Sequence, residues 1–132
     1  MLSNTSSSPV SKVALWTGRV LSALPVLMLL MSAYFKFNMP PDAKEGMTKI
    51  GWNESMLAPL GILEIACTII YVIPQTAVLG AILLTGYLGG AIATHVRVGE
   101  PFIVPAALGV VIWLGLYLRD VRIRALIPLR SL

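Results

Sequence analysis

The sequence predicts an all-α fold, a four-helix transmembrane bundle that runs up-down-up-down. Hydrophobic residues make up 57% of the 132-residue chain and charged residues only 12%, about half the charged share of a soluble domain. The mean hydropathy is +0.84. Four apolar segments of roughly membrane-spanning length follow one another along the chain. With so few charges a domain of this size could not cover a soluble surface, so we expect a membrane protein rather than a soluble enzyme.

We divide the chain into three regions. Residues 1–12 form a Ser-rich lead that we expect to be disordered, residues 13–118 form the membrane domain, and residues 119–132 form a basic tail along the interface. The first span covers 13–35, with Arg19 close enough to its start to reach the headgroups. The start of the chain also resembles a signal peptide, but MLLMSAYFKF contains no small-x-small cleavage site, so we expect the span to be retained.

The second and third spans form an antiparallel hairpin. Residues 36–54 make the one long polar connection, which we expect to be a loop that ends in an interfacial aromatic anchor, Trp52. The second span covers 55–73 and the third covers 76–96. Only Pro74 and Gln75 lie between them, so the chain must reverse direction there.

A fourth span over 102–118 places both termini on the same side of the membrane. The basic residues near the termini are Lys12, Arg19, Arg119, Arg122, Arg124 and Arg130. The opposite loops contain Lys36, Lys44, Lys49 and Arg97, which four acidic residues balance. Because basic residues favour the cytoplasmic side, we expect both termini to be cytoplasmic.

Glu64 is the polar residue that most needs an explanation. It lies in the middle of the span 55–73, where a carboxylate costs at least about 2.5 kcal/mol. Gly61, Glu64, Thr68 and Tyr71 follow a three-four-three spacing and therefore share one helical face. We expect this face to line the interior of the bundle.

The candidate partners of Glu64 are Lys36, His95 and Arg97, all near the non-cytoplasmic ends of their helices. His95 lies about 13 Å along the axis from the middle of its span, so a direct pair with Glu64 requires a bend, a vertical shift or bridging water. Two interpretations stay open. The functional one is a proton-handling or ligand-orienting site. In the structural one the carboxyl only fixes helix register, and its hydrogen-bond partners would be Thr68, Thr85 or Tyr87.

A stripe of small residues marks the third span. Gly86, Gly90 and Thr94 recur every four residues, which is the pattern of close helix packing in lipid. We expect the stripe to face the second span of the hairpin, and the alternative is a second copy of the chain in a homo-oligomer.

Several classes of chemistry lack the residues they need. One histidine cannot supply bis-histidine haem ligation, and no P-loop, dinucleotide fingerprint or Ser-His-Asp set is present. Glu64, Cys67 and His95 lie at depths that do not converge, so we expect no metal site. The arginine tail lacks the stacking aromatics of a nucleic-acid-binding surface. We therefore expect no catalytic residues, no resident cofactor and no nucleic-acid partner.

The chain resembles the DoxX-like membrane family. The run LLTGYLGGAIATHVRVGEP over 83–101 is the most specific match. WTGRVLSAL, GILEIACTIIYVIPQTAVLGAILLTGY and WLGLYLRDVRIRALIPLR extend the resemblance over nearly the whole chain from Trp16. The resemblance implies a small four-helix protein of the bacterial inner membrane. The family takes its name from a subunit associated with thiosulfate:quinone oxidoreductase, and other members are linked to membrane redox or oxidative-stress complexes. It provides no catalytic motif to transfer.

We therefore expect an accessory membrane subunit that is not an enzyme on its own, with a polar site inside the bundle. That site could contact a quinone or a lipid, and a membrane redox enzyme is one partner it could serve. Two alternatives stay open: a small proton-coupled transporter or channel component, and a membrane scaffold that recruits a soluble partner through its arginine tail.

Overall fold

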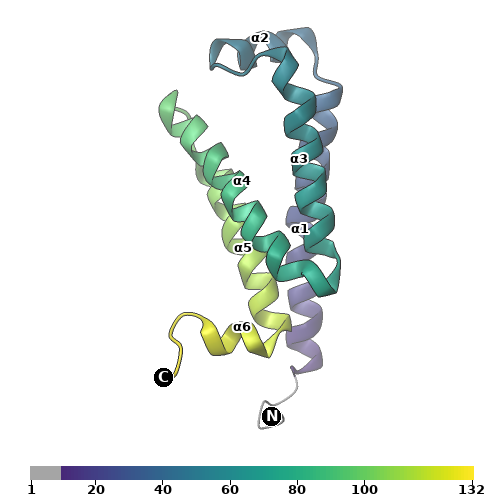
Figure 1. Cartoon of the computed structure of the whole chain (residues 1–132), viewed down its shortest axis with the longest axis vertical. Coiled ribbons are helices and arrows are strands. Elements are labelled where there is room, and N and C mark those ends of the chain that lie inside the picture. Colours follow the sequence, from purple (N-terminus) through teal and green to yellow (C-terminus); the bar gives the residue numbers. More distant parts are fainter. Residues whose placement is uncertain (1–9) are drawn as a thin grey trace.

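The computed structural model describes residues 10–132, and it is helical, with no strand in that range (Figure 1). The predicted all-α class is therefore confirmed. Most of the predicted lead over 1–12 lies outside the described residues, but its last two residues are ordered. Ser11 caps the first helix by accepting a hydrogen bond from Ala14 N at 3.1 Å, and Lys12 is the first helical residue.

Seven helical elements follow in chain order over residues 10–132. They are α1 (Lys12–Phe37), α2 (Pro41–Lys49), α3 (Glu54–Val72), η1 (Pro74–Thr76), α4 (Ala77–Arg97), α5 (Ile103–Arg119) and α6 (Val121–Leu126). The four long helices run in alternating directions, and α2 and α6 lie at opposite ends of the molecule (Figure 1).

Among the described residues, three helices are long and apolar enough to cross a membrane. They are α1, α3 and the segment Pro74–Arg97 that contains α4. α5 is also apolar but has only 17 residues, about 25 Å of helix against a hydrocarbon core of about 30 Å. The chain is thus a multi-pass membrane protein.

The connection over 36–54, which we predicted to be a loop, contains the helix α2. Pro41 at its start and Asp42 in its first turn favour helix initiation. Gly51, with φ of 100°, ends the segment in a conformation that other residues rarely adopt. Sequence periodicity missed α2 because the helix is short, polar and has no buried residue.

The long helices pack in a ring in which α1 and α4 each contact both α3 and α5. α1 and α5 approach closely at Gly18 and Gly115, where a Cβ on Gly18 would lie 2.8 Å from the Gly115 carbonyl oxygen. The polar face of α3 is buried as predicted: Gly61, Glu64, Thr68 and Tyr71 all lie in the interior. Tyr71 donates a hydrogen bond to the Ile112 carbonyl at 2.8 Å, which ties α3 to α5.

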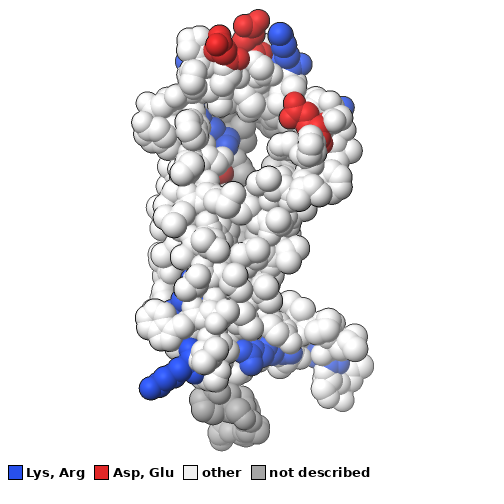
Figure 2. All heavy atoms as spheres, turned by 180° about the vertical axis from the view of Figure 1, so that it is seen from behind, with Lys and Arg blue, Asp and Glu red and all other residues white. Residues whose placement is uncertain are grey.

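Charged side chains gather at the two ends of the molecule. In Figure 2, acidic and basic side chains both appear at the α2 end, basic ones appear at the α6 end, and the waist between them is almost uncharged. A basic side chain is visible inside a hollow below the α2 end. An uncharged waist between charged ends is the surface that a bilayer requires.

Candidate functional site

A cavity of about 420 Å³ opens between α3 and α4 toward the α2 end, where these two helices diverge (Figure 1). We call it the α2-end cavity. Its lining residues are Lys36, Met47, Ile50, Trp52, Leu60, Leu63, Gly86, Tyr87, Gly90, Ala91, Thr94, His95 and Glu100. The walls are mostly apolar, and the polar groups are few, which is the usual composition of a small-molecule site.

The predicted pair of Lys36 and Glu64 forms at the inner end of this cavity. Lys36 Nζ lies 3.0 Å from Glu64 Oε1. The Glu64 side chain is 2% exposed and that of Lys36 15% exposed. Because a buried carboxylate without a partner is very costly, Lys36 supplies the partner that Glu64 needs at this depth.

Ser32, which shares a predicted face of the first span with Lys36, completes the arrangement, although it was not among the predicted site residues. Lys36 Nζ donates to Ser32 Oγ at 2.9 Å, and Ser32 Oγ lies 3.3 Å from Glu64 Oε1. Ser32 and Lys36 are one helical turn apart on α1, so the spacing of four was the signal that could have found Ser32.

Lys36 presents part of its ammonium group to the cavity. An ammonium has three N–H donors, and Ser32 and Glu64 accept two of them. Lys36 lines the cavity, whereas Glu64 lies behind it and does not. The ammonium also lies 5.9 Å from the centre of the Tyr87 ring, within the range of a cation–π contact. Lys36 is therefore the group that a ligand would meet, and Glu64 holds it in place.

His95 lines the same cavity but does not bind Glu64. Its Nδ1 lies 2.7 Å from the Ala91 carbonyl oxygen. Since a carbonyl only accepts, this contact requires the proton on Nδ1 and leaves Nε2 of the neutral ring as an acceptor. His95 and Glu64 therefore form no direct pair within residues 10–132.

Arg97 lies outside the cavity lining. Its Nη2 donates to the Ile50 carbonyl, and its guanidinium covers the face of Gly51. Arg97 therefore fastens the end of α4 to the turn after α2. The structure places Lys36 and His95 on one cavity, with Glu64 paired to Lys36 behind its wall, and Arg97 fastens its rim.

The hydrogen-bond partners expected in the structural interpretation of Glu64 differ from those found. Thr68 donates to the backbone carbonyl of Glu64 at 2.7 Å, not to the carboxylate. Thr85 donates to Ala81 O at 2.7 Å and accepts from Trp113, so it is also occupied elsewhere. Within residues 10–132, the Glu64 carboxylate accepts hydrogen bonds from Ser32 and Lys36 and from none of these three.

The small-residue stripe does not pack against α3. A Cβ added to Gly86 or Gly90 would meet no atom within 4 Å, whereas Gly86, Gly90 and Thr94 all line the α2-end cavity. We expected this stripe to pack against the other helix of the hairpin, but in the structure it forms part of the cavity wall. The close contact of α4 with α3 lies at Gly80, where an added Cβ would overlap the Tyr71 backbone.

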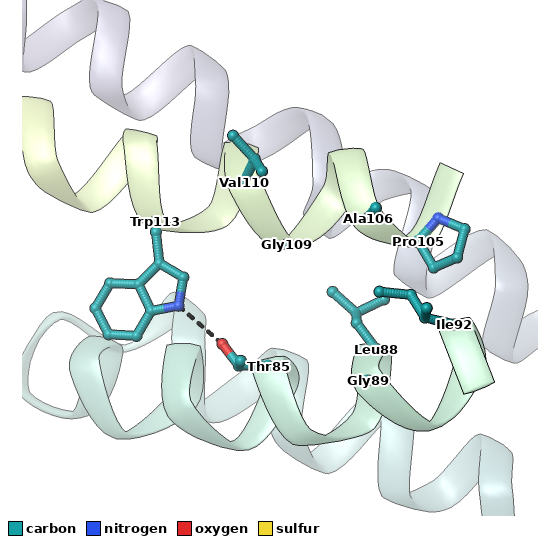
Figure 3. A pocket seen from close by; sticks show the side chains of 9 residues that line it. All are labelled: Thr85, Leu88, Gly89, Ile92, Pro105, Ala106, Gly109, Val110 and Trp113. Carbon is teal, nitrogen blue, oxygen red and sulfur yellow. Dashed lines mark hydrogen bonds between the residues drawn. The ribbon is translucent and has the colours of Figure 1, made fainter. Parts of the chain in front are cut away.

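A second groove of about 540 Å³ lies between α4 and α5 (Figure 3). Its polar groups satisfy each other, because Trp113 Nε1 donates to Thr85 Oγ1 at 2.8 Å. The remaining lining is apolar or glycine. With no free polar group to orient a ligand, this groove is a weaker candidate than the α2-end cavity, which contains the free ammonium donor.

A scan against family models matches residues 20–115 to the DoxX-like family. The chain belongs to the DoxX-like family. The match covers most of this DoxX-like chain, including Lys36, Glu64 and His95. Searches of curated proteins and of solved structures found no match. Membership therefore agrees with a helical membrane protein and leaves its activity to be argued from the site.

Within residues 10–132, no group of three or more His, Cys, Asp and Glu side chains lies close enough together to hold a metal ion. Cys67 is buried on α3 at 4% exposure and packs in the core between the helices.

Proposed function

We propose that this chain is a non-catalytic, accessory subunit of the bacterial inner membrane that holds a small amphipathic ligand, a quinone or a lipid, in the α2-end cavity. The observation that carries the proposal is the buried Lys36–Glu64 pair, whose ammonium keeps one N–H donor for the cavity. A membrane redox enzyme that uses the same ligand is the partner this function implies.

The proposed topology has four spans that run up-down-up-down, with both termini cytoplasmic. Its support is the alternating course of the long helices and the concentration of arginines at the α6 end. α5 would be the fourth span, and the local bilayer would thin slightly to match its length. The α2-end cavity would then open toward the periplasmic surface.

The cavity suits the head of a quinone better than that of a zwitterionic lipid. A quinone carbonyl would accept from Lys36, and its other polar atoms would lie near His95 at the rim, while Leu60 and Leu63 would contact the ring. Glu64 would hold Lys36 in place through their ion pair. This mode of binding requires no acidic group other than Glu64 and Glu100.

Binding of a short-tailed quinone to the purified full-length chain tests this proposal. Trp52 lines the cavity, so quenching of tryptophan fluorescence reports occupancy. A single change at Lys36 or Glu64 leaves a buried charge unpaired and costs about 3–5 kcal/mol. The double variant Lys36→Met/Glu64→Leu avoids this, because both charges are removed together. We expect it to keep its helix content and melting temperature and to lose at least about tenfold in affinity, the strength of one hydrogen bond to a charged donor.

Trp113→Phe is the matched control. It breaks the Trp113–Thr85 hydrogen bond in the other groove and leaves the α2-end cavity intact. We expect its quinone affinity to equal that of the wild-type chain. Equal binding by the Lys36→Met/Glu64→Leu variant, or equal loss in Trp113→Phe, would contradict the proposal.

Proton-coupled transport is the second candidate, favoured by the presence of His95 on the same cavity as the Lys36–Glu64 pair. It predicts solute flux into proteoliposomes that depends on a pH gradient and is lost in the Lys36→Met/Glu64→Leu variant, in which no buried charge is left unpaired. The accessory-subunit proposal predicts quinone binding with no such flux.

A further inference from the structure

A separate polar cavity of about 550 Å³ lies at the α6 end of the molecule. Its walls come from the start of α1, the turn that contains η1, and the corner between α5 and α6. Arg19, Arg119 and Arg122 line it together with one carboxylate, Asp120. We call it the arginine cavity.

The charges in this cavity do not balance. Arg122 engages both oxygens of Asp120, with Nε 3.1 Å from Oδ1 and Nη2 2.9 Å from Oδ2. Across residues 10–132, Arg19 and Arg119 form no ion pair with a carboxylate. Three guanidinium groups against one carboxylate leave the cavity with an excess of positive charge, which favours an anion from outside the chain.

Neutral contacts hold these two guanidinium groups in place. Arg119 Nε donates to Ser22 Oγ at 3.2 Å, and its guanidinium lies 5.6 Å from the centre of the Tyr71 ring. The Arg19 guanidinium lies 4.8 Å from the centre of the Trp16 ring. None of these contacts neutralises the charge, and each leaves N–H donors free. A guanidinium fork matches the two oxygens of a phosphate group.

An apolar extension continues from the same two arginines. A second cavity of about 260 Å³ shares Arg19 and Arg119 and continues along α1 and α3. Its other walls include Ala23, Val26 and Val72. A small soluble anion would gain nothing from this apolar surface, whereas an acyl chain would be stabilised by burying apolar area against it.

We propose that the arginine cavity binds the phosphodiester headgroup of an anionic phospholipid, with Arg19 and Arg119 on the phosphate and an acyl chain against Ala23 and Val26. Trp16 is 60% exposed beside Arg19, which suits an aromatic residue at headgroup level. The site is at the opposite end from the α2-end cavity, so it does not depend on quinone binding. Basic pockets between membrane helices bind such headgroups by the same electrostatics.

Native mass spectrometry of the full-length chain tests the proposal after exchange with equal amounts of phosphatidylglycerol and phosphatidylcholine. We expect phosphatidylglycerol to be retained in preference. Arg19→Gln should weaken its retention about fivefold, the effect of one basic residue near a lipid phosphate. Arg19 is exposed, so this change should leave the melting temperature unaltered. Val78→Trp, which narrows the cavity and keeps every charge, should also lower retention.

Arg130→Gln is the matched control, because it removes the same charge from an exposed position outside both cavities. We expect it to retain phosphatidylglycerol as the wild-type chain does. Equal retention of the two lipids, or equal losses in Arg19→Gln and Arg130→Gln, would overturn the site. Displacement of phosphatidylglycerol by glycerol phosphate at equal concentration would overturn the lipid assignment and identify a soluble phosphate site.

Discussion

At the scale of single residues, the position of one proton donor decides what the α2-end cavity can do. Glu64 attracted notice because its charge lies deep in a span, yet the structure places Lys36 between Glu64 and the cavity. The carboxylate thus fixes a cation, and the cation lines the cavity. A buried acid that pairs with its neighbour need not be the group that performs the chemistry.

Asp120 provides a pH-dependent prediction at the same scale. Hydrogen bonding from Arg122 is the main cause that lowers the pKa of Asp120 below its usual 3.8. Asp120 also caps α6 by accepting from Arg122 N at 2.9 Å. Because the folded pKa is lowered, the stabilisation is complete above pH 3.8 and is lost as the pH falls through the folded pKa. An ion pair this close to the surface contributes less than about 1 kcal/mol.

Melting temperature measured against pH checks this expectation. The wild-type curve should fall more steeply below pH 3.8 than that of Asp120→Asn. Asp42→Asn, which changes an exposed carboxyl without an ion pair in residues 10–132, should keep the wild-type slope. Parallel curves for wild type and Asp120→Asn would contradict the assignment.

At the scale of helices, the contact between α1 and α5 depends on glycine. A Cβ on Gly115 would lie 3.1 Å from Gly18 O and would overlap Ser22 Oγ. In lipid, helices associate through such close backbone contacts, because apolar side chains gain little by leaving the bilayer.

Gly115→Ala should therefore separate α1 from α5 and cost about 1–3 kcal/mol of stability, the usual cost of overpacking. Gly89→Ala is the control, since its Cβ would meet nothing within 4 Å. There the better helix propensity of alanine should raise stability by about 0.5–1 kcal/mol. Thermal unfolding of the two variants in the same detergent tests this. Equal destabilisation would show that the close contact at Gly115 does not determine the stability of the α1–α5 packing.

At the scale of the whole molecule, the proposed topology predicts opposite accessibility of the two ends. In a Cys67→Ala background, Gly46→Cys in α2 should react with a membrane-impermeant maleimide from the periplasmic side. Ser131→Cys in the tail should react only after permeabilisation. Both positions are exposed, so access rather than burial decides the labelling.

Labelling of both cysteines from one side would mean that α5 does not cross. Only α3 and α4 would then separate the two positions, and an even number of spans places them on the same side. Reversed labelling would keep four spans and overturn the cytoplasmic termini. The first outcome would show that α5 is too short to cross the membrane. The second would show that the distribution of basic residues does not determine the orientation.

The sequence by itself determined the all-helical class and the DoxX-like family. The helix bounds differ from the predicted spans by one or two residues. Apolar length and periodicity are local properties, so a linear chain displays them directly. The same periodicity placed Gly61, Glu64, Thr68 and Tyr71 on the buried face of α3.

Only the tertiary structure decided which helix meets which face. The structure pairs Lys36 with Glu64 and places Gly86 and Gly90 on a cavity wall instead of at a helix contact. It also places Arg19 and Arg119, from opposite ends of the chain, on one cavity. The rotation and divergence of neighbouring helices depend on side chains packing across their contacts, such as Gly18 on Gly115. Periodicity along one helix carries no information about that rotation, which is why the sites appeared only once the helices were assembled.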